Sequence, residues 1–175
     1  RFSEMPAPQA YESCMALARA KPSAGFEAAI AWRDEGGGPA ARHCTAIALV
    51  GLGQLDEAAQ RLEDLVQTMG GFGAPERAAV LDQAGQIWLR LGDGTRAHAV
   101  LSAALQLDDT NSDLWVRRGE VLAGAGEYWE AIDDFSQALD RNDRAVDALV
   151  FRAAAYRLLE VPDLAADDLS RALAF

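Results

Sequence analysis

The chain has few cysteines, few basic residues and no long apolar run. Its 175 residues include two cysteines, which excludes a disulfide-stapled mini-protein and cannot supply a four-cysteine zinc site. Lys and Arg number 16 against 27 Asp and Glu, a net charge of −11. Such an acidic surface repels phosphate backbones and anionic lipid, so no nucleic-acid or membrane-surface binding is expected. The longest nearly unbroken apolar run, Ala46 to Gly53, falls far short of the roughly 20 residues that span a bilayer.

The composition is that of a folded domain. Half of the residues are hydrophobic and 25% are charged, which suits one globular domain with a sizeable core and not a disordered tail. No charged-then-apolar leader stands at Arg1. We therefore expect any export signal to have been removed or never to have been present.

What the sequence does contain is an internal repeat with a period of about 34 residues, which appears when 78–111, 112–145 and 146–175 are aligned. Small residues recur in three columns, which are Gly85, Gly119 and Ala153; Ala97, Ala131 and Ala165; and Ala104, Ala138 and Ala172. Large apolar residues fall between them, as in Leu101, Phe135 and Leu169. Repeats 39–77 and 9–38 fit with slips in two glycine-rich segments, Gly70–Pro75 and Gly36–Gly38.

Each repeat predicts two antiparallel helices. Apolar residues are spaced by three or four, and no β-branched residues alternate with polar ones over the length of a strand. Breaks fall where a hairpin needs a turn, for example at Gly92–Gly94 and Gly124–Gly126. Because one helical pair cannot bury its apolar stripe alone, the pairs are expected to stack on one another.

The repeat 112–145 resembles the tetratricopeptide repeat (TPR) family. The residues that carry the resemblance are Trp115, Gly119, Leu122, Gly126, Tyr128, Ala131, Phe135 and Ala138. The chain departs from the family pattern at Arg118, where a Leu is usual, and at Asp109 and Asp143, where a closing Pro is usual. The resemblance implies an all-α solenoid, a right-handed superhelix of five hairpins over 9–175, with 1–8 as an N-terminal extension.

The resemblance also implies a function. The concave surface of such a solenoid is lined by the first helix of each pair and binds a segment of another protein. The expected activity is therefore that of a non-enzymatic adaptor or scaffold without a cofactor, of bacterial type. By similarity, the second, fifth, ninth, twelfth and thirteenth positions of each repeat face the groove, which gives Leu17, His43, Ile47, Val50, Asp82, Gln86, Leu89, Arg90, Asp113, Val116, Glu120, Asp147, Val150 and Arg157.

The chemistry of these positions indicates a kind of ligand. Some TPR proteins hold a partner's C-terminal carboxylate with Lys, Asn and Arg at the fifth and ninth positions. Here those positions carry residues such as Ile47, Asp82 and Glu120, so a carboxylate clamp is not expected. We predict a protein or peptide partner with an apolar stripe and some Lys or Arg. The alternative is that these side chains only solvate one face.

Cys14 and Cys44 occupy the same position of the first two repeats. They form a candidate disulfide, if the shortened first repeat brings their helices together. A bridge would imply an oxidising compartment such as a bacterial periplasm. The alternative is a pair of small buried residues in a cytosolic protein.

No other pattern predicts catalysis or metal binding. Neighbouring helix positions such as His43 and Cys44 point about 100° apart, so they do not form a nucleophile–base pair. The pairs Asp133-Asp134 and Asp167-Asp168 lack the spacing of a calcium loop. Their recurrence at the same place in two successive repeats instead predicts a solvated convex face.

Two other hypotheses remain open. Because the chain ends at Phe175 with no capping helix, its last repeat is expected to be truncated or covered by another copy. A structural, self-assembling protein is therefore the alternative function. An enzyme or small-ligand binder would need a convergent polar pocket, for which the sequence offers no candidate.

Overall fold

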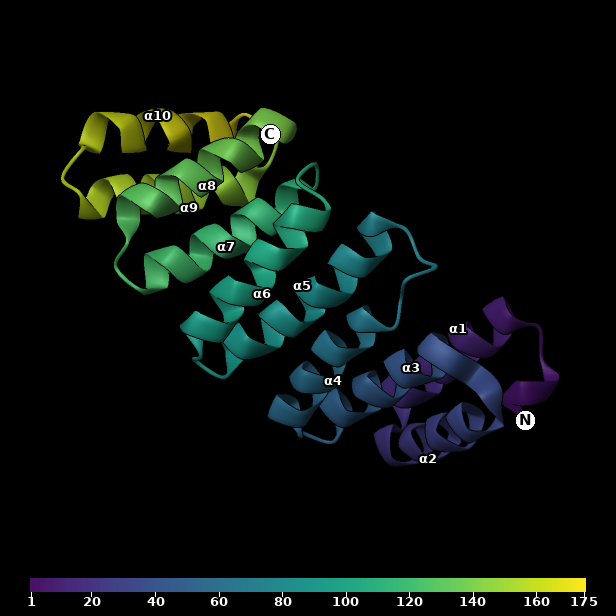
Figure 1. Cartoon of the computed structure of the whole chain (residues 1–175). Helices are drawn as coiled ribbons and strands as arrows, with labels where there is room; N and C mark the ends of the chain where they lie inside the picture. Colours follow the sequence, from purple (N-terminus) through teal and green to yellow (C-terminus); the bar gives the residue numbers. More distant parts are fainter. The chain divides into compact units, whose positions relative to one another are not determined.

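The computed structural model describes the whole chain, Arg1–Phe175, and is all-helical. Figure 1 shows its helices as antiparallel pairs. The five hairpins are α1 (Ala7–Ala20) with α2 (Pro22–Trp32), α3 (Gly38–Gly51) with α4 (Leu55–Gln67), α5 (Ala74–Arg90) with α6 (Gly94–Leu107), α7 (Ser112–Gly124) with α8 (Tyr128–Arg141), and α9 (Val146–Leu158) with α10 (Pro162–Leu173). A 3-10 turn, Phe2–Glu4, precedes α1, and a π-helical turn, Arg33–Gly37, joins α2 to α3. The predicted all-α fold is confirmed.

The helices group into two compact units, Arg1–Gly73 and Ala74–Phe175. The border lies in the glycine-rich segment where the repeat spacing slips. Helix α5 begins at Ala74, upstream of the predicted start of its repeat at Ala78. Pro75 is tolerated there because the first turn of a helix has no partner for its N–H.

Four of the five hairpins turn through a residue with left-handed backbone. The φ angles are 77° at Gly53, 76° at Gly92, 81° at Gly126 and 61° at Glu160. L side chains rarely adopt this region, so glycine is the residue expected there. Glu160 is the exception, and it occupies the same place in the last repeat as Gly126 in the repeat before it.

The columns of small residues mark close approach between the two helices of a hairpin. A Cβ on Gly119 of α7 would lie 2.5 Å from the ring of Phe135 on α8, and one on Gly85 of α5 would lie 2.8 Å from Leu101 on α6. Phe135 and Leu101 are fully buried. The two glycines therefore occupy equivalent environments, as the repeat predicts.

In the first unit, a disulfide joins Cys14 on α1 to Cys44 on α3, with a Cα–Cα distance of 6.1 Å. Both cysteines are fully buried in a core that includes Met15 and Trp32. The helices of the first hairpin are also very close, since a Cβ on Gly25 of α2 would collide with the backbone of α1. This tight packing accompanies the shortened first repeat.

Two aspartates expected on a solvated face are buried instead. Asp134 is 4% exposed and Asp168 is 3% exposed. Arg118 donates to both oxygens of Asp134, at 2.7 and 2.9 Å, and also to Ser102 Oγ at 3.2 Å. The prediction of a solvated face was wrong for these two residues. Burial of a lone carboxylate is too costly, but an arginine that pairs and hydrogen-bonds with the carboxylate offsets that cost.

The same three-residue group occurs again in the next repeat. Arg152 donates to Asp168 at 2.8 and 2.7 Å, and to Ser136 Oγ at 3.0 Å. In each group the arginine lies on the first helix of a hairpin, the aspartate on the second helix, and the serine on the second helix of the preceding hairpin. These groups therefore connect consecutive hairpins, and they explain why Arg118 departs from the family pattern.

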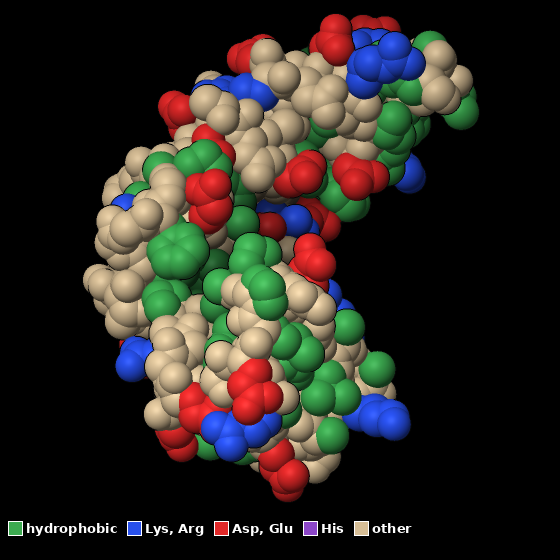
Figure 2. All heavy atoms as spheres, turned by 90° about the vertical axis from the view of Figure 1, so that its right-hand side faces the viewer, with side chains coloured by type: hydrophobic (Ala, Val, Ile, Leu, Met, Phe, Trp, Pro, Cys, Tyr) green, Lys and Arg blue, Asp and Glu red, His purple; other side chains and the backbone are tan.

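Other acidic side chains stand at many separate points of the face shown in Figure 2, among patches of hydrophobic ones.

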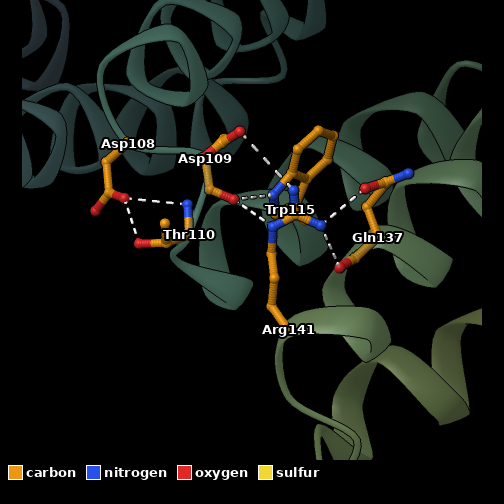
Figure 3. A network of polar contacts seen from close by, with 6 residues as sticks. All are labelled: Asp108, Asp109, Thr110, Trp115, Gln137 and Arg141. Carbon is orange, nitrogen blue, oxygen red and sulfur yellow. Dashed lines mark hydrogen bonds and ion pairs between the residues drawn. The ribbon is translucent and has the colours of Figure 1, made fainter.

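A second polar network fixes the junction between α6 and α7 (Figure 3). Trp115 Nε1 donates to the carbonyl oxygen of Asp109 at 2.9 Å, and Arg141 Nε donates to the same oxygen. The Arg141 guanidinium lies 4.7 Å from the centre of the Trp115 ring and also donates to Gln137 Oε1 at 2.8 Å. Arg118 approaches the Trp115 ring at 5.2 Å. The space beside α7 is thus filled by one indole and two guanidinium groups.

Candidate functional site

Helices α7 and α9 of the second unit form a cavity of about 480 Å³ together with the loop between α8 and α9. Four of the residues predicted to face the groove line it, namely Asp113, Val116, Glu120 and Asp147. The lining also includes Arg117, Asn142, Arg144, Ala145, Val146 and Phe151. The cavity therefore combines carboxylates with an apolar surface.

Arg117 forms an ion pair with a carboxylate that does not line this cavity. Its Nε and one terminal nitrogen donate to the two oxygens of Asp82 on α5, at 2.5 and 3.2 Å. The Asp82 side chain is only 15% exposed, and it also accepts from Gln86 at 3.1 Å. Asp82 and Arg117 therefore neutralise each other, which leaves three carboxylates and one cation, Arg144, among the other residues of the cavity lining.

Glu120 has an unfavourable environment for its charge. Burial raises the pKa of the Glu120 carboxyl above its ordinary value, Arg117 lowers it, and Asp147 raises it again. A carboxylate that is desolvated and close to another acid gains when a cation approaches. The cavity is thus suited to a Lys or Arg side chain, with Val116, Val146 and Phe151 available for an apolar neighbour.

The other predicted positions of the second unit lie outside this cavity. Gln86, Arg90, Val150 and Arg157 are all exposed. Leu89 lines a different cavity of about 620 Å³ between the α5–α6 and α7–α8 turns. Val116 is 9% exposed and belongs to the core around Phe135, so it offers only its edge to a ligand.

In the first unit, the predicted positions Leu17, His43, Ile47 and Val50 are all half-buried. The Tyr11 hydroxyl and His43 Nδ1 form a hydrogen bond of 2.7 Å, and their rings are stacked with centroids 5.8 Å apart. Burial raises the pKa of Tyr11, and Arg19 lowers it. Ile47 packs against the core that contains the disulfide. These side chains form a surface that is more apolar than that of the second unit.

Solved structures with similar folds come from several proteins. MamA residues 41 to end from Desulfovibrio magneticus RS-1 match at a TM-score of 0.79 and 16% identity, over 96% of this chain and 92% of that one. YrrB, a TPR protein with an unusual peptide-binding site, matches at a TM-score of 0.75 and 16% identity, over 97% and 84%. The chain has the TPR fold. The second TPR domain of Spaghetti (RPAP3), solved with the HSP90 peptide SRMEEVD, matches at a TM-score of 0.54 and 23% identity, over 55% and 90%.

No family model and no curated protein sequence matches the chain. The TPR fold nevertheless places the cavity on the first helices of two consecutive hairpins. Arg117 and Phe151 were not among the predicted residues, although they occupy the same position of two successive repeats. That position directly follows the fifth position of the repeat. A prediction that also counted this position as facing the groove would have included both residues.

No group of three or more His, Cys, Asp and Glu side chains is arranged to hold a metal ion. None of the helices combines the length and hydropathy needed to cross a bilayer.

Proposed function

We propose that this chain is a non-enzymatic protein-interaction module that binds a segment of a partner protein in the α7–α9 cavity. The observation that carries the proposal is the half-buried Glu120 carboxylate, which lines the same cavity as Asp113, Asp147 and an apolar surface. The partner segment carries a Lys or Arg next to an apolar residue. The TPR fold supports the proposal, because YrrB has a peptide-binding site and the RPAP3 domain was solved with a bound peptide.

The charge of the ligand follows from the cavity. The peptide SRMEEVD bound by the RPAP3 domain has more acidic than basic side chains, and three carboxylates of this cavity would repel it. A peptide of opposite character gains from the same carboxylates. SRMEEVD therefore serves as a matched negative control for the present chain.

The experiment selects ligands from a random displayed peptide library and measures the binding of the selected peptides by fluorescence anisotropy. We expect the selected sequences to combine Lys or Arg with an apolar residue, and Glu120→Lys to weaken their binding by tenfold or more, taken as about 1.4 kcal/mol of lost interaction. Glu130→Lys makes the same charge change at an exposed site on α8 and should leave binding within about twofold. Selection of acidic peptides, or equal binding by the two variants, would contradict the proposal.

A second candidate function is self-association through α10, with a second copy of the chain as the occupant. Leu169 is 40% exposed and Leu173 is 87% exposed. The residues at the same repeat positions on α8, Phe135 and Leu139, are 0% and 7% exposed. The α10 face is therefore a continuation of an interface that the neighbouring hairpin covers with apolar contacts.

Sedimentation velocity over a range of protein concentrations tests this second candidate. Self-association through α10 predicts dimers that disappear in Leu173→Glu and persist in Leu91→Glu, which changes a leucine that is 44% exposed elsewhere. A monomer at all concentrations, or dimers that survive Leu173→Glu, would remove this candidate and leave the peptide-binding proposal intact.

A further inference from the structure

The first unit contains a cavity of about 330 Å³ with an unusual concentration of arginines. It is lined by Arg33 of the π-helical turn after α2, Arg42 and Thr45 on α3, and Arg61, Asp64 and Leu65 on α4. Three of the 16 basic residues of an acidic chain thus converge on one opening, with a single carboxylate among them. Like charges placed together cost free energy unless something compensates them.

The repeat explains how this cavity arises. The hairpins α3–α4 and α7–α8 correspond residue by residue with a constant offset, which pairs Ala46 with Gly119 and Leu62 with Phe135. With the same offset, Thr45 stands where α7 has Arg118. The position of Asp134 is taken by Arg61, and the position of Trp115 by Arg42.

Loss of the long side chain leaves the space open. In the second unit, Arg118 extends from α7 to reach Asp134 and Ser102, and it also approaches the Trp115 ring. The Thr45 hydroxyl instead donates to the carbonyl oxygen of Ala41 on its own helix, at 2.9 Å. Thr45 is shorter than Arg118 and bonds within its own helix, and the cavity lies beside Thr45 and Arg61, the two positions that Arg118 and Asp134 occupy in the α7–α8 hairpin.

The charge at this place is also reversed. A buried carboxylate, Asp134, is replaced by the guanidinium of Arg61, whose Nε donates to Glu57 at 2.8 Å. Arg33 uses Nε and one terminal nitrogen on the neighbouring Asp34, at 3.1 and 3.0 Å. Neither of these two ion pairs includes Arg42. Since each guanidinium has five N–H donors, several remain available at the cavity.

We propose that this cavity binds a phosphate group through Arg33, Arg42 and Arg61. Guanidinium groups match phosphate oxygens in planar, bidentate geometry, and a dianion is attracted to a cavity whose lining holds three guanidinium groups and one carboxylate. This site belongs to the first unit and is independent of the peptide-binding proposal for α7 and α9. The phosphate is either the free ion or an ester carried by a partner.

The test titrates inorganic phosphate, and in a second arm O-phosphoserine, into the protein at constant ionic strength. Binding is followed by the arginine Nε–Hε signals in NMR spectra and by calorimetry. We expect saturable binding that shifts the signals of Arg42 and Arg61, and a loss of at least about tenfold in affinity in Arg42→Gln and in Arg61→Gln. Tighter binding of O-phosphoserine identifies an ester, and equal or weaker binding identifies the free ion.

Two further variants make the test specific. Arg96→Gln removes an exposed arginine that pairs with Asp93, and it should bind phosphate like the unchanged protein. Thr45→Arg with Arg61→Asp rebuilds the ion pair of the α7–α8 hairpin, so it should fold, fill the cavity and lose phosphate binding. Absence of saturable binding, equal losses in Arg96→Gln and Arg61→Gln, or full binding by the folded double variant would overturn the proposal.

Discussion

Arg118 and Asp134 form a two-pronged ion pair inside the α7–α8 hairpin, with a third hydrogen bond from Arg118 to Ser102 of the preceding hairpin. Hydrogen bonding to Asp134 raises the pKa of the Arg118 guanidinium, against the effect of burial. The Arg118 guanidinium therefore stays charged.

Removal of that aspartate leaves the guanidinium without its partner. We expect Asp134→Ala to lower the free energy of unfolding by about 3–5 kcal/mol, because an unpaired charge stays in the hairpin. Asp133→Ala, at the adjacent exposed position, should change it by less than about 0.5 kcal/mol. Urea denaturation followed by circular dichroism measures both, and a comparable loss in the two variants would show that the pair is not a structural element.

The left-handed turn at Glu160 offers a stabilising substitution. Glu160→Gly places glycine at φ 61°, where the other turns already have it, and should raise the free energy of unfolding by about 0.5–1 kcal/mol. Gly126→Ala, at φ 81°, should have the opposite effect. Thermal denaturation compares the two, and a lower melting temperature for Glu160→Gly would disagree with the turn geometry.

Glycines within α7 should respond differently to the same substitution. A Cβ at Gly119 would lie 2.5 Å from Phe135, whereas nothing lies within 4 Å of one at Gly124. Gly119→Ala should destabilise by about 1–3 kcal/mol through overpacking, and Gly124→Ala should stabilise by about 0.5–1 kcal/mol through helix propensity. Equal effects of the two changes in chemical denaturation would argue against close α7–α8 contact.

The disulfide contributes to the stability of the first unit. Its sequence separation is 30 residues, for which the chain-entropy model gives about 3–4 kcal/mol. Cys14→Ser with Cys44→Ser should lower the stability of this unit by that amount, and reductant should destabilise the unchanged protein but not the variant. Thiol titration of the native protein provides the direct check, since two free thiols would be inconsistent with the bridge.

Peptide binding at the α7–α9 cavity should depend on pH. Because burial raises the pKa of Glu120, this group binds protons more readily in the folded chain than in the unfolded chain. Its stabilising contribution is therefore present at low pH and is lost as the pH rises through the raised pKa. A bound Lys or Arg favours the carboxylate, so binding releases protons and the affinity should increase as the pH rises through the same range.

Glu120→Gln isolates that contribution. The variant cannot titrate, so the rise in affinity with pH should be smaller than in the unchanged protein. Calorimetry in buffers of different ionisation enthalpy measures the proton release. Identical pH profiles for the two proteins would assign the dependence to another group.

The sequence predicted the hairpins well because their signal is repeated. The column that contains Gly85, Gly119 and Ala153 reports a local requirement, close helix packing, that any copy of the repeat must meet. The cavity residues were predicted less completely. Arg117 and Phe151 were missed because their roles depend on the side-chain direction of one helix relative to the next, and composition does not encode that direction.

The buried aspartates show a second limit of sequence reasoning. Asp134 and Asp168 look like solvated residues when read alone, since carboxylates are seldom buried. Their partners Arg118 and Arg152 stand far from them along the chain, in a different helix. The only sequence signal for burial is that Arg, Asp and Ser recur together in two successive repeats. This signal becomes recognisable once the three residues are placed on adjacent helices.

The arginine that spans two hairpins has a consequence for how the second unit comes apart. Peeling α9 and α10 from α8 would strip Ser136 of its Arg152 donor and open the core that Phe135 and Phe151 share. Unfolding of the last hairpin therefore removes a hydrogen bond from the hairpin before it. In the same way, unfolding of α7 removes the hydrogen bond that Ser102 accepts from Arg118. Unfolding of one hairpin gains little conformational entropy relative to the interactions that it breaks. These three hairpins should therefore unfold together in one cooperative transition.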